Sequence, residues 1–378
     1  MSQPFEYLQD RLHQFASIDR LRMLRPVQVD GTKIRLTDGR ELINFGSNDY
    51  LGIAAQQTVS SVATGSGSSS LVCGWTNQHE TLANRIAEFE TTESAVIFPS
   101  GFAACSGTIA TLAEPDDLIL SDELNHASII DGCRLSRSDR QVYKHRDMNV
   151  VRSTLADCRS KYKHVWIVTD SVFSMDGHIA PLNELAEIAA EYGATVIVDE
   201  AQATGVLGES GTGLCEAMGA KNQIPIRIGT LSKAIGSQGG FVAGPKVVID
   251  YLVNQCRSLI FSTALSPAAV QASLNSLQVI SNEPARRKHV QEMARLVRSE
   301  LGLGSISEIE AAVPIVSIPI GSDSRAVAKS TELTERGFYV PAIRPPTVPE
   351  GTARLRVSLS AAHTEQEVRA LVRLLVNH

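Results

Sequence analysis

The 378-residue chain has no apolar run long enough to span a membrane, and its N-terminus does not resemble a secretory signal. Glu6, Asp10 and Arg11 interrupt the apolar positions there. The six cysteines are scattered without a Cys-x-x-Cys pair, so we expect neither a metal site nor a disulfide framework. These absences predict a protein of the reducing cytoplasm.

An excess of positive charge is also missing, because the net charge is -6. Nothing in this balance would attract nucleic acid or an anionic membrane surface, so neither is expected as a partner. Hydrophobic residues make up 43% of the chain and charged residues 20%, which is the composition of an ordinary globular protein. The length allows one large domain and a smaller one.

Two nucleotide-binding motifs are incomplete. The segment Val196-Ile-Val-Asp-Glu-Ala-Gln202 resembles the magnesium-holding strand of a helicase-type ATPase, but the chain has no Gly-x-x-x-x-Gly-Lys-Ser/Thr loop. Gly65-Ser-Gly67 lacks the third glycine and the preceding strand of a dinucleotide site. A P-loop-type ATPase is therefore only a remote alternative.

From about residue 80 onward, helical periodicity alternates with short apolar strands. The helix at 182–192 should end at Gly193. This alternation is typical of an α/β protein with a mainly parallel sheet covered on both faces. The strand candidates are 95–98, 165–168, 194–198, 226–229 and 240–243.

The two ends of the chain have different patterns. Phe5, Leu8, Leu12 and Phe15 recur at helical spacing, and the strands 33–36 and 41–45 flank an Asp-Gly turn. Near the C-terminus, strands at 314–319 and 354–359 precede a capping box, Thr364 with Glu367. We therefore predict a helix and hairpin segment (1–45), a large α/β domain (46–280) and a small α+β domain (281–378).

Polar residues follow the predicted strands, at the sheet edge where open α/β proteins bind ligands. Asp199 ends a Val-Ile-Val run, and Lys233 follows the strand 226–229 among small residues. A carboxylate can keep a ring nitrogen protonated, and such a lysine can bind a cofactor covalently. This pair predicts pyridoxal 5'-phosphate (PLP), whereas a non-catalytic binding module would give Lys233 no reason for its position.

A PLP phosphate needs backbone N–H groups and hydroxyls. Ser100, Gly101 and Phe102 come between a strand and a helix, so they offer a helix N-terminus to an anion. Thr230 and Ser232 offer hydroxyls, and His126 is a flat ring that can stack on the cofactor. Each signal is weak alone, but their order along the chain is much more specific.

These residues resemble the α-oxoamine synthases, a family of fold-type I PLP-dependent transferases, from about Arg22 to His363. The resemblance is carried by seven motifs, namely Asn44-Phe-Gly-Ser-Asn-Asp-Tyr-Leu-Gly52, Ser100-Gly-Phe-Ala, His126-Ala-Ser, Ser174-Met-Asp-Gly177, Asp199-Glu-Ala, Thr230-Leu-Ser-Lys233 and Phe261-Ser-Thr263.

The resemblance implies a role for each matched residue. Lys233 would bind the cofactor and serve as acid and base at Cα, Asp199 would pair with the pyridine nitrogen, and His126 would stack on the ring beside the substrate. Thr263 would reach the phosphate of a neighbouring subunit, which implies a homodimer with shared active sites. The other implied cofactor contacts are Ser100, Gly101, Phe102, Ser174, Gln202 and Thr230, and the implied substrate contacts are Arg22, Asn48, Thr347 and Arg356.

The C-terminal segments Ala342-Ile-Arg-Pro-Pro-Thr-Val-Pro349 and Gly351-Thr-Ala-Arg-Leu-Arg356 are most similar to those of the family's biotin-pathway members. That similarity implies decarboxylative condensation of L-alanine with a pimeloyl thioester, carried by coenzyme A or by an acyl carrier protein. Arg20, Arg22 or Arg25 would then contact the polar end of the acyl chain. The alternatives within the family are glycine with acetyl-CoA and serine with a long-chain acyl thioester.

The chain departs from the family pattern at three places. Gln202 replaces the usual histidine, and glutamine can donate a hydrogen bond to the phenolic oxygen of PLP but cannot carry charge. The stretch between Leu51 and Gly65 is shorter than usual, and Leu71 replaces a polar or basic residue. The last two changes bear on the entrance for the thioester.

Overall fold

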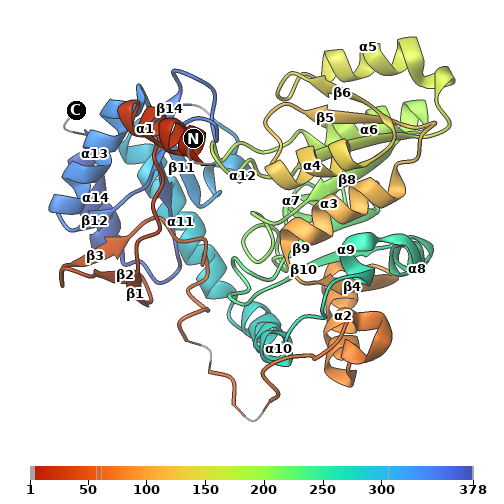
Figure 1. Cartoon of the computed structure of the whole chain (residues 1–378), viewed down its shortest axis with the longest axis horizontal. Helices are drawn as coiled ribbons and strands as arrows, with labels where there is room; N and C mark the ends of the chain where they lie inside the picture. Colours follow the sequence, from red (N-terminus) through yellow and green to blue (C-terminus); the bar gives the residue numbers. More distant parts are fainter. Residues whose placement is uncertain (1–4, 57, 61, 305, 377–378) are drawn as a thin grey trace.

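The computed structural model describes residues 5–56, 58–60, 62–304 and 306–376. These residues form a larger lobe built on one wide sheet and a smaller lobe that contains the C-terminal strands (Figure 1). The consecutive helices α10 (Pro267–Asn282) and α11 (Pro284–Glu300) lead from the larger lobe to the smaller one.

The larger lobe contains the sheet that the alternating pattern predicts. Its seven strands pair in parallel except at β10, which runs antiparallel to both of its neighbours, so the mainly parallel α/β fold is confirmed. Their spatial order is β4 (Ser94–Phe98), β10 (Gly240–Gly244), β9 (Ile226–Thr230), β8 (Thr195–Asp199), β7 (Val165–Asp170), β5 (Leu118–Asp122) and β6 (Asp139–Tyr143).

Helices cover both faces of this sheet, which explains why β9 and β10 are buried along their whole length. Side chains of α3, α4, α8 and α9 pack in one apolar cluster, and those of α2, α5 and α6 in the other. Gly193 ends α6 in the left-handed conformation, as predicted. The bounds are α2 (Asn77–Glu90), α3 (Gly101–Leu112), α4 (Ala127–Leu135), α5 (Met148–Cys158), α6 (Leu182–Tyr192), α7 (Leu214–Ala217), α8 (Lys246–Gln255) and α9 (Arg257–Ile260), with a 3-10 turn η2 (Arg159–Lys161).

The smaller lobe combines residues from both ends of the chain. A three-stranded sheet has the order β11 (Ile315–Gly321), β14 (Ala353–Ser358), β13 (Ala342–Ile343). The predicted hairpin is present as β2 (Lys33–Leu36) and β3 (Glu41–Asn44), and β1 (Val27–Asp30) extends it. The fourth strand of that sheet, β12 (Phe338–Tyr339), pairs in parallel with β3, so the N-terminal hairpin lies against the C-terminal part.

Helices α12 (Glu308–Ala311), α13 (Asp323–Glu335) and α14 (Glu365–Val376) complete this lobe. The predicted capping box begins α14, because the Thr364 hydroxyl donates to Glu367 at 2.9 Å and accepts from the Glu367 main-chain N–H at 3.2 Å.

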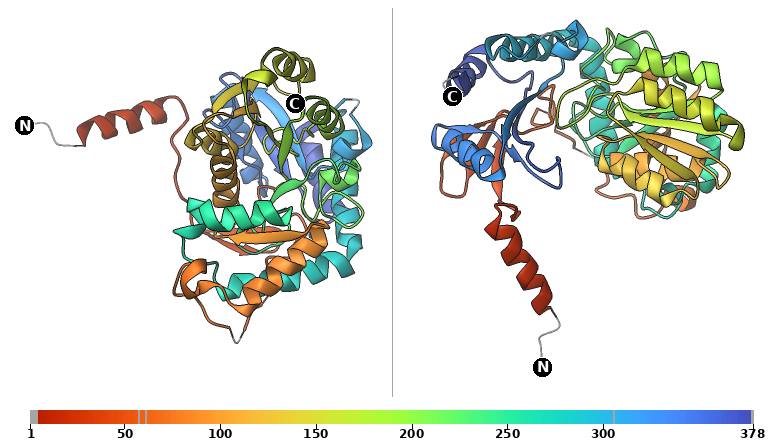
Figure 2. Two further views of the ribbon diagram at one scale, coloured as in Figure 1. Left: turned by 90° about the vertical axis from the view of Figure 1, so that its right-hand side faces the viewer. Right: turned by 90° about the horizontal axis from the view of Figure 1, so that it is seen from above.

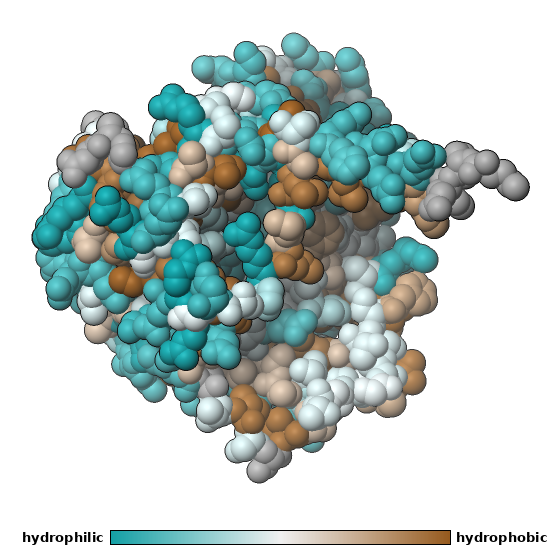
Figure 3. Space-filling view, turned by 60° about the vertical axis from the view of Figure 1, so that its left-hand side comes forward, coloured by the Kyte–Doolittle hydropathy of each residue, from teal (hydrophilic) through white to brown (hydrophobic). Residues whose placement is uncertain are grey.

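The N-terminal helix α1 (Glu6–Ser17) is present as predicted, but it projects away from both lobes (Figure 2). Its apolar residues Leu8, Leu12 and Phe15 are all exposed. Figure 3 shows this arm at the right-hand side, where apolar side chains reach the surface. No helix in the described part of the chain has the length and apolar character needed to cross a membrane.

The region of the sequence departures has little regular structure. The residues described between Leu51 and Gly65 contain neither helix nor strand. Leu71 lies in the short π-helix η1 (Ser70–Gly74), and its side chain is exposed.

Candidate active site

Three adjacent strands of the large sheet end at one edge in acidic or hydroxyl side chains. Asp170 ends β7, Asp199 ends β8 beside it in the ladder, and Thr230 ends β9. All three are buried. The end of an apolar strand is therefore the reason that Asp199 sits within the protein and not on its surface.

Lys233 lies in the loop that follows β9, close enough to Asp199 and Asp170 to interact with both. Burial lowers the pKa of Lys233, and the two carboxylates oppose that shift. A lysine with a lowered pKa has a larger neutral fraction, which is the form that attacks a carbonyl carbon. The predicted pairing of Lys233 with Asp199 is thus present in space.

Asp170 is a carboxylate that the sequence interpretation did not single out. Burial and the charge of Asp199 raise its pKa well above the usual range. Its carboxylate accepts the main-chain N–H of His126 at 2.6 Å, which fixes the start of α4. The signal was available, since Asp170 also follows a buried strand.

The N-terminus of α3 forms the second part of the site. The Ser100 hydroxyl caps the helix by accepting from the Ala103 N–H at 3.1 Å. The N–H groups of Gly101 and Phe102 have no hydrogen-bond partner within the described residues. Since a helix N-terminus carries partial positive charge, these groups suit an anion.

Thr230 lies directly against this helix N-terminus. A Cβ atom at Gly101 would come within 3.0 Å of the Thr230 hydroxyl oxygen, so glycine is needed for this close approach. The hydroxyls of Thr230 and Ser232 are 2.8 Å apart. Two hydroxyls and two unpaired N–H groups are the kind of donor set that a phosphate group takes.

His126 is the N-terminal cap of α4 and its side chain is exposed. Its Nδ1 atom lies 2.7 Å from the Ser128 hydroxyl, and its ring lies edge-on to Phe102 with the ring centroids 6.4 Å apart. The ring is therefore anchored at one nitrogen and leaves a face open beside the N-terminus of α3.

Arg356 of β14 brings the smaller lobe to this edge. Its guanidinium donates to the Asn48 side-chain oxygen at 3.1 and 3.2 Å, to the Ser174 main-chain oxygen at 2.5 Å and to the Ser358 hydroxyl at 2.8 Å. Both Arg356 and Ser358 are buried, and no acidic side chain forms an ion pair with Arg356 within the described residues. A buried arginine without an acidic partner favours binding of a ligand carboxylate.

Gln202 is linked to Arg356 by Tyr50, a residue that the sequence interpretation also missed. The Tyr50 hydroxyl lies 2.5 Å from the Gln202 side-chain oxygen and 3.3 Å from an Arg356 nitrogen. Tyr50 is fully buried, and Gln202 is nearly so. The position of Tyr50 in the Asn-Asp-Tyr-Leu-Gly motif was the only signal for it.

The remaining predicted residues lie apart from this group. Arg22 donates to the Thr347 hydroxyl at 3.1 Å, so the two predicted acyl contacts are brought together, but both are exposed. Arg20 is paired with Asp323 and Glu350. Thr263 is exposed and bridges to Ser69, and among the described residues no hydrogen bond links it to Lys233 or Arg356.

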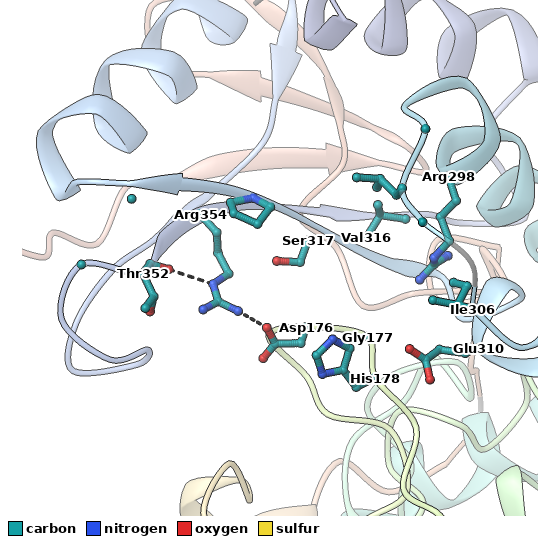
Figure 4. A pocket seen from close by; sticks show the side chains of 16 residues that line it. Asp176, Gly177, His178, Arg298, Ile306, Glu310, Val316, Ser317, Thr352 and Arg354 are labelled. Atoms are coloured by element: carbon teal, nitrogen blue, oxygen red, sulfur yellow. Dashed lines mark hydrogen bonds and ion pairs between the residues drawn. The ribbon is translucent and has the colours of Figure 1, made fainter. Parts of the chain in front are cut away.

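A cavity of about 740 Å³ lies next to the Arg356 site, between β11, β14 and the loop 176–178 (Figure 4). An ion pair between Arg354 and Asp176 crosses its wall, with Ser317 and His178 nearby (Figure 4). Arg354 and Arg356 are two residues apart on one strand and therefore face the same side. The cavity therefore lies along the sheet of the smaller lobe, and Arg354, but not Arg356, lines it.

The site as a whole fits PLP. It offers a lysine with lowered pKa, a buried carboxylate on the adjacent strand end, a ring able to stack, and a phosphate-binding donor set. The second acid of the ATPase alternative is already occupied, because Glu200 accepts the main-chain N–H groups of Leu214 and Cys215 at 3.0 and 2.7 Å. Glu200 therefore holds α7 in place.

Comparison with known proteins agrees with this geometry. The family model for class I and II aminotransferases matches residues 40–375. The 8-amino-7-oxononanoate synthase of Lysinibacillus sphaericus is 42% identical over 359 residues, 93% of this chain and 92% of that protein. Among solved structures, the Sphingomonas wittichii serine palmitoyltransferase has a TM-score of 0.90 and 28% identity, covering 100% of this chain and 98% of its own.

The solved 8-amino-7-oxononanoate synthase of Francisella tularensis has a TM-score of 0.73 and 28% identity, covering 89% of this chain and 97% of its own. The family match extends over most of the chain, and PLP is the cofactor of these proteins. This chain belongs to the class I and II aminotransferase family, within its α-oxoamine synthase group, and is a PLP-dependent acyltransferase.

Proposed function

We propose that this enzyme condenses L-alanine with a pimeloyl thioester, on coenzyme A or an acyl carrier protein, and releases CO2 and the free thiol. The product would be 8-amino-7-oxononanoate, and the reaction would be a cytoplasmic step of biotin biosynthesis. The observation that carries this proposal is the 42% identity to an 8-amino-7-oxononanoate synthase over nearly the whole chain.

PLP, when bound, supplies an electron sink for the carbon atom that reacts. Lys233 holds the cofactor and then removes and returns the proton at the amino acid Cα. Asp199 keeps the pyridine nitrogen protonated, because a buried carboxylate needs a cationic partner. His126 stacks on the ring. On the face of the ring where the substrate binds, it limits the position of Cα.

The phosphate is bound by Ser100, Gly101, Phe102 and Thr230, whose N–H and hydroxyl groups converge at the start of α3. Thr263 belongs to the site of the other subunit in a homodimer, which is consistent with its exposure in this chain. Ser174 and Gln202 flank the phenolic oxygen.

Arg356 and Asn48 bind the carboxylate of alanine. The Arg356 guanidinium is already held by Ser174 and Ser358, so little side-chain entropy is lost when the carboxylate binds. This carboxylate is the group that leaves as CO2, so its orientation relative to Cα decides how readily the bond breaks.

Arg22 and Thr347 contact the thioester where it enters. The polar end of the acyl chain is not assigned to Arg20, since that guanidinium is already paired with two carboxylates. The similarity to serine palmitoyltransferase at a TM-score of 0.90 makes serine with a long-chain acyl thioester the second candidate.

The test is CO2 release and product formation with each donor and acyl pair. We expect alanine with pimeloyl-CoA or a pimeloyl carrier protein to give the highest kcat/KM. Faster turnover of glycine with acetyl-CoA, or of serine with palmitoyl-CoA, would contradict the proposed substrates and leave the family unchanged.

A further inference from the structure

Tyr50 lies between Gln202, which follows β8, and Arg356 of the smaller lobe. Its hydroxyl lies 2.5 Å from the Gln202 side-chain oxygen, 3.1 Å from the Asn48 side-chain oxygen and 3.3 Å from an Arg356 nitrogen. Its side chain has no solvent exposure. Burial raises the pKa of Tyr50, so the hydroxyl keeps its proton throughout the range in which the enzyme works.

Hydrogen-bond counting decides where the tyrosine proton goes. Arg356 has only N–H donors, so its contact uses a lone pair of the Tyr50 oxygen. The Asn48 oxygen already accepts two N–H groups of Arg356, at 3.2 and 3.1 Å. The single Tyr50 proton therefore goes to Gln202, which is also its shortest contact.

This assignment fixes the orientation of the Gln202 amide. With its oxygen facing Tyr50, its NH2 group must point the other way. That nitrogen has no hydrogen-bond partner in the described part of the chain, and it is not among the atoms there that are both fully buried and unpaired. An NH2 group with free donors, three residues after Asp199 at the same strand end, is suited to an oxygen of the cofactor.

We propose that Tyr50 is a positioning residue that orients Gln202 so that its NH2 group donates to the phenolic oxygen of PLP. In this chain the Tyr50–Gln202 pair thus does, without a titrating group, what a histidine would do at this position. The inference rests on the proposed PLP site and deepens it. Through its one hydroxyl, Tyr50 would also connect Arg356, and so the substrate carboxylate, to the cofactor.

The effect of the proposed Gln202 hydrogen bond on the cofactor can be measured in the holoenzyme without substrate. The phenolic oxygen shares a proton with the Lys233 nitrogen, and a donor at that oxygen makes this proton easier to lose. The pH midpoint of the visible absorbance band should therefore rise when the donor is lost or misoriented. A hydrogen bond of ordinary strength corresponds to a rise of about half to one pH unit.

Other ionisable groups face the same nitrogen and must stay unchanged between variants. These are Asp199, Asp170, Cys105, His126 and Arg356. None of the substitutions proposed below replaces any of these residues.

The experiment compares Tyr50→Phe, Gln202→Met and the double variant by pH titration of the absorbance band. We expect both single variants to raise the midpoint, with Gln202→Met raising it at least as far. The double variant should match Gln202→Met, because Tyr50 acts only through Gln202. Tyr143→Phe is the matched control, since it removes a buried tyrosine hydroxyl that has no hydrogen-bond partner among the described residues, and it should leave the midpoint unchanged.

A midpoint that moves in Gln202→Met but not in Tyr50→Phe would overturn the role of Tyr50. The same holds if the two shifts add in the double variant. If Tyr50→Phe fails to fold, Tyr50→Met replaces it, because it also removes the hydroxyl without adding a charge and should raise the midpoint to the same extent. A holoenzyme without the band contradicts both the proposed function and this inference, whereas a band with an unmoved midpoint contradicts this inference alone.

Discussion

The cofactor end of the site and the proposed acyl entrance differ in how the chain builds them. At the cofactor end, Asp199 and Thr230 end adjacent buried strands, and Lys233 follows in the next loop. At the entrance, Arg22 and Thr347 are exposed and share one hydrogen bond of 3.1 Å. The sheet fixes the positions of the residues in the first region, whereas the second region forms where two surface segments meet.

This difference has an energetic meaning. A buried polar group without a partner costs about 1–3 kcal/mol, so each side chain at the sheet edge is held in a single arrangement. An exposed pair contributes only about 0–1 kcal/mol, so the entrance can change its residues and geometry at little cost. The chemistry should therefore depend strongly on the first region, and substrate preference on the second.

The strongest test of this contrast is Lys233→Ala. We expect turnover to fall by roughly 10²–10⁴-fold or more, because the acid and base at Cα is lost. Borohydride should attach the cofactor covalently to the wild-type protein and not to the variant, as measured by mass spectrometry of the intact chain. Lys246→Ala, at an exposed lysine paired with Asp250, is the control and should behave as wild type. Equal labelling of both variants would contradict the assignment.

The next effect is expected for Arg356→Ala. Loss of the charge-assisted partner should weaken alanine binding by about 1.5–3 kcal/mol, roughly tenfold to 150-fold in Kd, with cofactor affinity changed much less. Alanine titration of the holoenzyme, followed by its absorbance, measures the affinity for alanine, and PLP titration of the cofactor-free protein measures the affinity for the cofactor. Arg354→Ala is the matched comparison, since Arg354 lies two residues away and is paired with Asp176. A larger loss in Arg354→Ala would move the carboxylate site to that arginine.

A smaller effect is expected for Thr263→Ala, which should weaken cofactor binding by about 0.5–1.5 kcal/mol. Mixing subunits gives the sharper result. A heterodimer of Lys233→Ala and Thr263→Ala chains would contain one intact site if Thr263 serves the partner subunit. If the site is shared, the one site of the mixed dimer that keeps Lys233 should bind PLP with wild-type affinity. If it is not shared, that site should have the weakened affinity of the Thr263→Ala dimer. A fully active monomer in sedimentation at low concentration would refute it.

The smallest effect is expected at the entrance. Thr347→Ala should raise KM for the acyl thioester by about two- to fivefold, because an exposed hydrogen bond contributes up to about 1 kcal/mol. The affinity for alanine should stay the same. Arg25→Ala tests whether nearby exposed positive charge has the same effect. A large drop in kcat for Thr347→Ala would show that the entrance takes part in the chemistry, and the contrast between the two regions would fail.

Most of the fold could be predicted because its strands and helices have strong local patterns. The strand before Asp199 and the helix that ends at Gly193 were both located to within about a residue. The reversed direction of β10 could not be predicted, since an apolar strand has the same pattern in either direction. The pairing of β12 with β3 was also missed, because only two residues make it.

The residues of the site could likewise be predicted only where a local sequence pattern places them. Asp199 and Lys233 lie where the strand-end argument places them, whereas Tyr50 is identified only by the tertiary contact with Gln202. A tyrosine beside a glycine turn has many possible uses, and nothing local distinguishes them. Residues that act through contacts between distant segments require the structure.

The contact between Asn48 and Arg356 has a consequence for how the protein is made. These two residues are 308 positions apart, and β3 likewise pairs with β12, which is synthesised much later. During translation the last strand of the seven-stranded sheet, β10, is synthesised by Gly244, so the large lobe can collapse while the ribosome still holds the smaller one. The hairpin near the N-terminus must remain without its neighbouring strand throughout that interval. A nascent chain can thus form the cofactor end of the site well before β14 supplies Arg356 to its other end.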